Sequence, residues 1–233
     1  MIEEYHCENE QSEPKQDEVG NNEIRNNEDR KNEDKHNEDR HNKGRHNEAG
    51  KNGQKRTLLC LGDSITQGMT AKSPSSTYPV QLARMMGMNM INQGVGGHVF
   101  DEKSIDEEMD INPDVITVAY GINDWFQYDS VDYFKEMCHN FFNKLTIVYP
   151  KAKIFVITPV WCSSEEEIKA MGYLFEIRKQ IEQIACNFKT VYVIDGLKMV
   201  PNMPEYFVDG VHPNELGFMH YSMNLLREIV KYI

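Results

Sequence analysis

The chain has 233 residues, with 25 Lys and Arg against 37 Asp and Glu, which gives a formal net charge of −12 at pH 7. The length allows one ordinary domain and an additional segment, and the acidic balance disfavours nucleic acid as a partner, because phosphate backbones are bound by basic surfaces. No stretch approaches the roughly 18 consecutive apolar residues of a membrane-spanning helix, so we expect no membrane span.

Residues 1–56 differ in character from the rest of the chain. Residues 21–55 repeat with a period of five, and Asn holds the second place of every unit. This period matches neither a helix nor a strand, and a segment with so few apolar residues cannot offset its ordering entropy. We therefore predict a disordered, low-complexity tail over residues 1–56. Its start lacks the basic-then-apolar pattern of a secretory signal, so we expect a cytoplasmic protein.

Residues 57–233 have the composition of one globular domain. Short apolar runs that are partly β-branched alternate with longer amphipathic stretches, which is typical of strands and helices in turn. This alternation predicts an α/β fold, a three-layer sandwich around a mostly parallel sheet. The predicted strands are residues 57–61, 88–92, 115–120, 153–158 and 191–194.

Three amphipathic stretches predict the longer helices. Apolar residues recur at helical spacing over residues 131–148, over 168–184 and over 219–230. Ser164 with Glu167 fits a capping box, so we expect the second of these helices to open at Ser164. Asn214 is a plausible cap for the last helix, whose stripe of Met219, Met223, Leu226 and Val230 we expect to pack in the core.

Polar, glycine-containing clusters follow the first three predicted strands, and a fourth lies near the C-terminus. They read Gly-Asp-Ser-Ile-Thr at 62–66, Asn-Gln-Gly-Val-Gly-Gly-His at 92–98, Gly-Ile-Asn-Asp at 121–124 and Asp-Gly-Val-His-Pro at 209–213. The carboxyl ends of parallel strands meet at one edge of a sheet, where sites form. We therefore expect the first three clusters to converge there.

The clusters contain the groups that acyl transfer requires. A serine hydroxyl becomes a nucleophile when a base takes its proton, and His212 is the natural base for Ser64. Asp209 lies three residues before His212 and is close enough to orient the imidazole and stabilise its charged form. Asp195, at the end of the fifth predicted strand, is an alternative acid that the short spacing to His212 disfavours.

The same clusters offer donors for an oxyanion. Ser64 and Gly97 each have a backbone N–H, and Asn123 has a side-chain amide. Gly94 and Gly96 compete with Gly97 for this role, and the distance from the second predicted strand favours Gly97.

The order of Gly-Asp-Ser, a glycine-rich turn, Gly-x-Asn-Asp and Asp-x-x-His resembles the four signature blocks of the SGNH (GDSL-like) hydrolase superfamily over residues 57–233. One departure is Ile65, where the name GDSL implies Leu. The resemblance implies a flavodoxin-like fold with a five-stranded parallel sheet, Ser64, Asp209 and His212 as the triad, and Gly97 and Asn123 as oxyanion donors. It also implies ester hydrolysis without a metal or cofactor, and the widely spaced cysteines likewise indicate no zinc site.

Several residues near these blocks are candidates for substrate binding: Asp63, His98, Asp124, Trp125 and Trp161. Asp63 could instead only cap a helix, and Asp124 could instead only stabilise the loop of Asn123. Gly-x-Asn-Asp followed by Trp, with the late Val-Asp-Gly-x-His-Pro-Asn stretch, is similar to bacterial carbohydrate O-acetyl esterases.

The expected substrate is therefore a short-chain ester, such as an O-acetyl group on a carbohydrate. The alternatives are a lysophospholipase, a thioesterase or a catalytically silent carbohydrate-binding protein. The sequence carries no signal for an oligomeric state.

Overall fold

The computed structural model describes residues 55–233. Five strands form one sheet in the order β2-β1-β3-β4-β5, and each neighbouring pair is parallel. The strands are β1 (Thr57–Gly62), β2 (Asn89–Gly94), β3 (Val115–Ala119), β4 (Lys153–Ile157) and β5 (Val191–Ile194). The predicted α/β fold with a five-stranded parallel sheet is confirmed.

The direction of the strand order reverses at β1, because β2 lies on one side of it and β3 on the other. The connections that leave β1 and β3 therefore diverge, which opens a crevice beyond their carboxyl ends. Two short helices begin there: α1 (Ser64–Gln67) directly after β1 and α3 (Ile122–Gln127) directly after β3.

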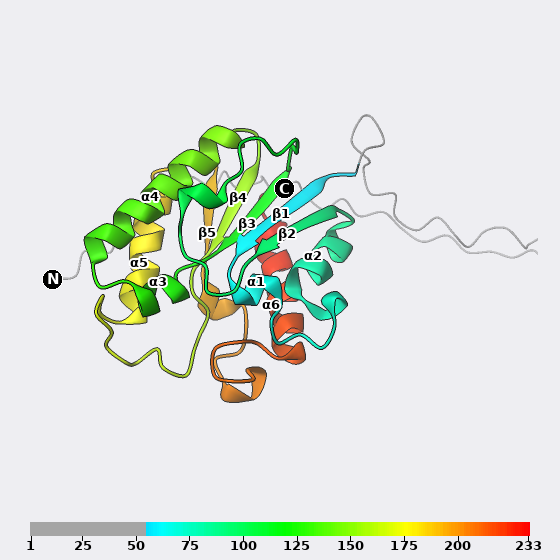
Figure 1. Cartoon of the computed structure of the whole chain (residues 1–233). Helices are drawn as coiled ribbons and strands as arrows, with labels where there is room; N and C mark the ends of the chain where they lie inside the picture. Colours follow the sequence, from blue (N-terminus) through cyan, green and yellow to red (C-terminus); the bar gives the residue numbers. More distant parts are fainter. Residues whose placement is uncertain (1–54) are drawn as a thin grey trace, which may run out of the picture. The chain divides into compact units, whose positions relative to one another are not determined.

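Four longer helices cover the two faces of the sheet (Figure 1). The helices α2 (Tyr78–Met86) and α6 (Glu215–Ile229) pack on one face, and α4 (Val131–Val148) and α5 (Leu174–Ala185) pack on the other. Short 3₁₀ helices lie in the connections at Pro74–Ser76, Glu102–Ser104, Gly196–Lys198 and Pro204–Tyr206.

The alternation of side chains along β1 shows why this sequence forms a central strand. Leu58 and Cys60 point into the core beneath α2 and α6, whereas Leu59 and Leu61 point into the core beneath α4 and α5. All four are buried, as expected for a strand that is covered on both faces. The strand ends at Gly62 with its position fixed on both sides by paired neighbours.

Two details of the predicted helices are wrong. The second begins at Leu174 and not at Ser164, because residues 163–166 form turns. Its capping carboxylate is Glu176, which accepts a hydrogen bond from the N–H of Tyr173 at 2.8 Å. The Ser164 pattern is satisfied locally, since the N–H of Glu167 donates to the carbonyl of Ser164.

The last helix begins as predicted, with the side chain of Asn214 accepting a hydrogen bond from the N–H of Gly217 at 3.0 Å. Its predicted core stripe is wrong, because Met219 and Met223 are 39% and 42% exposed. The buried face is one position out of step with that stripe and consists of Phe218, Tyr221, Ser222, Leu225 and Ile229.

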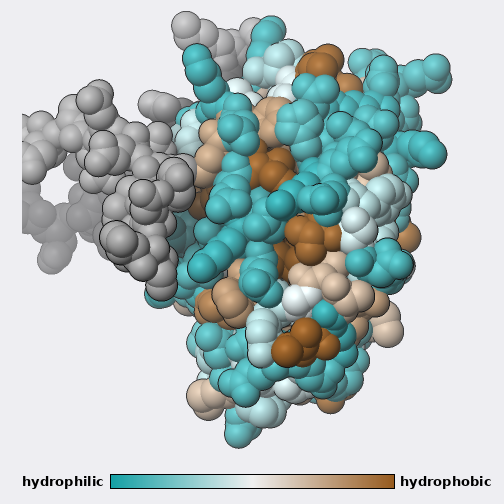
Figure 2. Space-filling model, turned by 90° about the vertical axis from the view of Figure 1, so that its left-hand side faces the viewer, coloured by the Kyte–Doolittle hydropathy of each residue, from teal (hydrophilic) through white to brown (hydrophobic). Residues whose placement is uncertain are grey.

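The predicted tail, residues 1–56, lies outside the described residues except for its last two. Within residues 55–233, no helix is long and apolar enough to cross a membrane. The face on the α4 and α5 side is mainly hydrophilic, with apolar residues in small separate patches (Figure 2).

Candidate active site

Ser64 is the first residue of α1 and lies directly beyond the carboxyl end of β1. The preceding residue, Asp63, caps this short helix by accepting a hydrogen bond from the N–H of Ile65 at 2.9 Å. Gly94, at the end of β2, packs so closely on α1 that a Cβ atom there would lie 2.2 Å from the backbone nitrogen of Gln67. The sharp turn from strand to helix therefore has supports on two sides.

His212 meets Ser64 across a separation of 148 residues. The hydroxyl oxygen of Ser64 lies 2.8 Å from Nε2 of His212. Nδ1 of His212 lies 2.7 Å from Oδ2 of Asp209. The structure thus places hydroxyl, imidazole and carboxylate in one chain of hydrogen bonds, which is the geometry of an activated nucleophile.

The turn that carries Asp209 and His212 is held by its own hydrogen bonds. Oδ1 of Asp209 accepts from the N–H of Val211 at 3.0 Å and from the N–H of His212 at 2.9 Å. Burial tends to raise the pKa of Asp209, but the hydrogen bonds from His212 and Val211 outweigh it, so the pKa lies below its ordinary value. The carboxylate is therefore ionised whenever the imidazole becomes charged.

The alternative acid, Asp195, does not hydrogen-bond to His212 and instead caps a short helix. Its side chain accepts a hydrogen bond from the N–H of Leu197 at 3.0 Å and so caps the 3₁₀ helix Gly196–Lys198. Its other oxygen lies 3.8 Å from the ammonium of Lys198.

The three glycines after β2 differ in the use of their N–H groups. The N–H of Gly94 donates to Asn92 and that of Gly96 donates to Gln67, each at 2.9 Å. Within residues 55–233, the N–H of Gly97 has no acceptor, and a Cβ atom on Gly97 would meet no atom within 4 Å. Gly97 therefore offers the open backbone donor of this turn, with a φ of +77° that favours glycine.

Asn123 lies in the first turn of α3 with its amide directed at two acceptors. Nδ2 donates to Oδ2 of Asp63 at 3.2 Å and to the carbonyl of His98 at 3.1 Å. Both amide hydrogens are thus engaged in this structure. An oxyanion would compete with the neutral carbonyl of His98 for one of them, and an ionised acceptor makes the stronger hydrogen bond.

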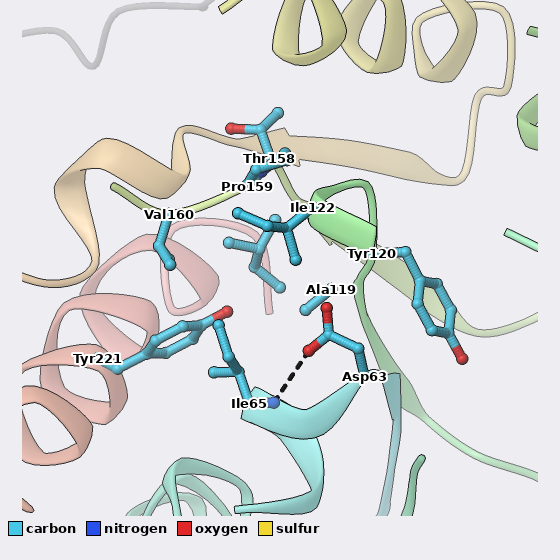
Figure 3. Close-up of a pocket in the computed structure, with 10 residues that line it drawn as sticks. Asp63, Ile65, Ala119, Tyr120, Ile122, Thr158, Pro159, Val160 and Tyr221 are labelled. Carbon is cyan, nitrogen blue, oxygen red and sulfur yellow. Dashed lines mark hydrogen bonds between the residues drawn. The ribbon is translucent and has the colours of Figure 1, made fainter. Parts of the chain in front are cut away.

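Asp63 is buried behind Ser64. Burial raises its pKa to about 6, although the hydrogen bond from Ile65 and the nearby imidazole of His212 oppose this shift. Figure 3 shows its carboxylate at the edge of a small pocket with Ile122, Pro159 and Val160. The cavity has a volume of about 20 Å³, which is enough for about one water molecule, and its lining is mainly apolar.

Two of the residues predicted to bind substrate, Trp125 and Asp124, are buried and so cannot contact a substrate in this structure. Trp125 is completely buried, and its indole N–H donates to the carbonyl of Gly172 at 2.9 Å. Asp124 is also completely buried and accepts from the N–H groups of Phe100 and Gly121, each at 3.0 Å. Burial raises the pKa of Asp124 to about 7. Both side chains fix the surroundings of Asn123 and do not face a substrate.

The other two aromatic candidates are half-buried. His98 follows Gly97, and its ring packs edge-on against Tyr120 with ring centres 5.8 Å apart. The ring of Trp161 packs against Phe207, 5.1 Å away. Both therefore retain exposed surface near the predicted site residues.

Two glutamines that support the glycine turn were not identified from the sequence. Oε1 of Gln67 accepts from the N–H of Gly96, and Nε2 of Gln127 donates to the carbonyl of Gly97 at 2.8 Å. Gln127 lies four residues after Asn123 in α3, so helical spacing places both on one side. That spacing is the signal that could have found it.

No three His, Cys, Asp or Glu side chains within residues 55–233 are grouped so as to hold a metal ion. The hydrogen-bonded serine, histidine and aspartate at the edge of a parallel sheet define a hydrolase-type site on an α/β fold. The model of the GDSL-like lipase/acylhydrolase family matches residues 60–219, and the chain belongs to this family.

Solved structures give the same result for the fold. A Bacteroides ovatus protein named as a GDSL-like lipase is 28% identical with a TM-score of 0.64, and the match covers 76% of this chain and 53% of that one. A family 2 carbohydrate esterase from Clostridium thermocellum, solved with cellohexaose, is 18% identical with a TM-score of 0.61, covering 76% and 64%. A two-domain esterase active on acetylated mannans is 18% identical with a TM-score of 0.60, covering 76% and 50%. This chain thus spans about half to two thirds of these three proteins, and no curated protein matches it.

Proposed function

We propose that this protein is a serine esterase that hydrolyses short-chain carboxylic esters, with O-acetyl groups on carbohydrates as its substrate class. The observation that carries the proposal is the hydrogen-bonded series from Ser64 through His212 to Asp209, with distances of 2.8 and 2.7 Å. A protein that only binds carbohydrate has no need of this arrangement.

The proposed reaction has two steps. Nε2 of His212 takes the hydroxyl proton of Ser64 while the serine oxygen attacks the acyl carbon, and Asp209 stabilises the imidazolium. The imidazolium then protonates the leaving alcohol, which leaves an acyl-serine. Water, deprotonated by His212, attacks the acyl-serine and releases the acid and the free serine. In each step His212 takes one proton and gives it back, first to the leaving alcohol and then to the serine oxygen, so the reaction balances without a cofactor.

The oxyanion of each tetrahedral intermediate requires donors on the side away from His212. The free N–H of Gly97 and the N–H of Ser64 in the first turn of α1 are suited to this role. Asn123 is the third donor in the proposal, and one of its amide hydrogens turns from the carbonyl of His98 to the oxyanion. Asp63 keeps the rest of the amide group oriented through its bond to Nδ2.

The preference for a short acyl group is supported by the small size of the pocket at Asp63. The cavity volume of about 20 Å³ is far below the usual range of pockets that enclose drug-sized ligands. A long acyl chain would have to lie outside it. The half-buried rings of Trp161 and Tyr206, near the turn of His212, are suited to stacking on sugar rings.

The test is a panel of p-nitrophenyl esters from acetyl to palmitoyl, together with acetylated xylo- and cello-oligosaccharides. The proposal predicts the highest kcat/KM for acetyl donors, release of acetate from the oligosaccharides and no release by Ser64→Ala. Comparable turnover of palmitoyl and acetyl esters would favour a lysophospholipase or thioesterase. Oligosaccharide binding without hydrolysis of any ester would favour a silent binding protein.

A further inference from the structure

Arg178 in α5 is the one buried cation within residues 55–233. Its side chain takes no part in the proposed chemistry and does not contact Ser64, Asp209 or His212. A buried charge is costly unless it is paired and hydrogen-bonded. The hydrogen-bond partners of Arg178 therefore indicate its structural role.

All the partners of Arg178 lie in the connection between β4 and α5. Nε donates to the carbonyl of Pro159 at 2.8 Å, and Nη2 donates to the carbonyl of Val160 at 3.0 Å. Nη2 also donates to the carboxylate of Glu165 at 2.9 Å. One guanidinium thus fixes both ends of the segment 159–165, which we call the support segment. The planar fork of arginine makes such divergent bonds, and a lysine cannot reproduce them.

The middle of the support segment lies against the turn that carries Asp209 and His212. The N–H of Ser163 donates to the carbonyl of Gly210 at 2.8 Å. A Cβ atom on Gly210 would lie 2.2 Å from the hydroxyl oxygen of Ser163, so the two segments touch without space for a side chain. Nearby, Trp161 of the support segment packs on Phe207, which pairs with Pro213 at the base of the same turn.

The internal hydrogen bonds of the turn fix Asp209 relative to His212 but not the turn relative to Ser64. Its placement depends on neighbours. The hydroxyl of Thr70 holds one side by donating to the carbonyl of Pro213 at 2.8 Å. The support segment holds the other side through Ser163.

We propose that Arg178 is a positioning residue for His212 that acts through the support segment and Gly210. This inference rests on the proposed function, because it assigns to Arg178 the task of keeping the imidazole at hydrogen-bond distance from Ser64. A displacement of about 1 Å at a reacting group costs on the order of 10²-fold in rate, so a loosened support is visible in turnover.

The experiment compares kcat and KM for p-nitrophenyl acetate in wild type, Arg178→Met, Gly210→Ala and the double variant. We expect Arg178→Met to lower kcat about tenfold with KM within about twofold, because the groups are present but badly placed. Gly210→Ala lowers kcat by pushing Ser163 away and by straining a backbone whose φ is +81°. The double variant should lose less than the product of the two single losses, because a released support segment yields to the new methyl group.

Lys144→Met is the matched control. It removes the ion pair between Lys144 of α4 and Glu107, and its effect should multiply with that of Gly210→Ala without coupling. If Arg178→Met does not fold, Glu165→Gln and Arg178→Lys replace it. Assayed at a temperature at which both are folded, they should lower kcat about threefold or more with KM within about twofold. Wild-type kcat in the folded variants, or losses that multiply in the double variant, would overturn the inference. An inactive wild type would instead refute the proposed function.

Discussion

The hydroxyl oxygen of Ser64 lies 2.8 Å from Nε2 of His212, although Ser64 begins the helix after the first strand and His212 lies just before the last helix. The fold brings them together because β1 is the strand at which the sheet order reverses, so the crevice opens at Ser64. The turn of His212 directly precedes α6 and meets Ser64 at this end of the sheet.

Replacing Asp209 by Asn tests the orientation of His212. The amide oxygen of Asn can keep the bonds to the N–H groups of Val211 and His212, but its NH₂ group would face Nδ1. The imidazole would then carry its proton on Nε2 and could not take the proton of Ser64. We expect kcat to fall by about 10³–10⁴ with little change in melting temperature.

Asp195→Asn is the matched control for Asp209→Asn, because Asp195 caps a 3₁₀ helix and does not bond to His212. It should retain kcat within about twofold. Equal losses in the two variants would contradict the assignment of Asp209.

Removing the amide of Asn123 tests the third oxyanion donor. Asn123→Ala should lower kcat for p-nitrophenyl acetate by about 10²–10³ while KM changes little, because the donor acts mainly on the transition state. Asn187→Ala is the control and should leave kcat unchanged, because it removes an exposed side-chain amide that lies after the end of α5. A KM effect without a kcat effect would show that Asn123 binds the ground state only.

Alanine substitutions at Gly94 and Gly97 distinguish a glycine needed for packing from a glycine needed at the predicted site. A methyl group at Gly94 would collide with the backbone of Gln67 in α1, so Gly94→Ala should cost about 3 kcal/mol of unfolding free energy. A methyl group at Gly97 meets only open space but requires a φ of +77°, which costs about 1 kcal/mol. Chemical denaturation measures both. A larger loss at Gly97 than at Gly94 would contradict the close packing of Gly94 on α1.

The raised pKa of Asp124 makes the free energy of unfolding depend on pH. Its pKa is about 7 in the folded chain against an ordinary value of 3.8, so the folded state holds the proton more tightly than the unfolded state. The stabilisation is present in full below about pH 4 and is lost as the pH rises through 7. The loss is about 4 kcal/mol at most.

Asp124→Asn removes this titration, while Asp63 continues to titrate in both proteins. The variant is less stable at low pH, because one of the two N–H groups of Phe100 and Gly121 loses its acceptor. Urea unfolding between pH 4.5 and 8.5 should show a flatter pH dependence in the variant than in wild type. Equal slopes would exclude the buried acid as their cause.

The sheet and the polar clusters of the site could be predicted from the sequence because each corresponds to a short local pattern of residues. Each strand is a short apolar run, and each polar block follows such a run directly, so the position of Ser64 or Asn123 required no knowledge of distant contacts. Their convergence followed from the parallel arrangement of the strands. The meeting of Ser64 with His212 depended on the resemblance to a family as well as on the chemistry of the residues.

The errors arose where the answer depends on the tertiary environment. In α6, the stripe of Met219 and Met223 and the stripe of Tyr221 and Leu225 both have helical spacing, and only packing on the sheet selects the second. Trp125 lies two residues after Asn123, but α3 turns about 100° per residue, so the indole points into the core. The support from Arg178 spans three segments, and no local pattern indicates it.

The most direct measurement is labelling with a fluorophosphonate, followed by mass spectrometry of the peptides. We predict modification of wild type at Ser64 alone, no modification of Ser64→Ala, and labelling of His212→Ala that is slower by on the order of 10³-fold or more. Modification at another serine, or labelling of Ser64 at the same rate with and without His212, would contradict a nucleophile activated by this histidine.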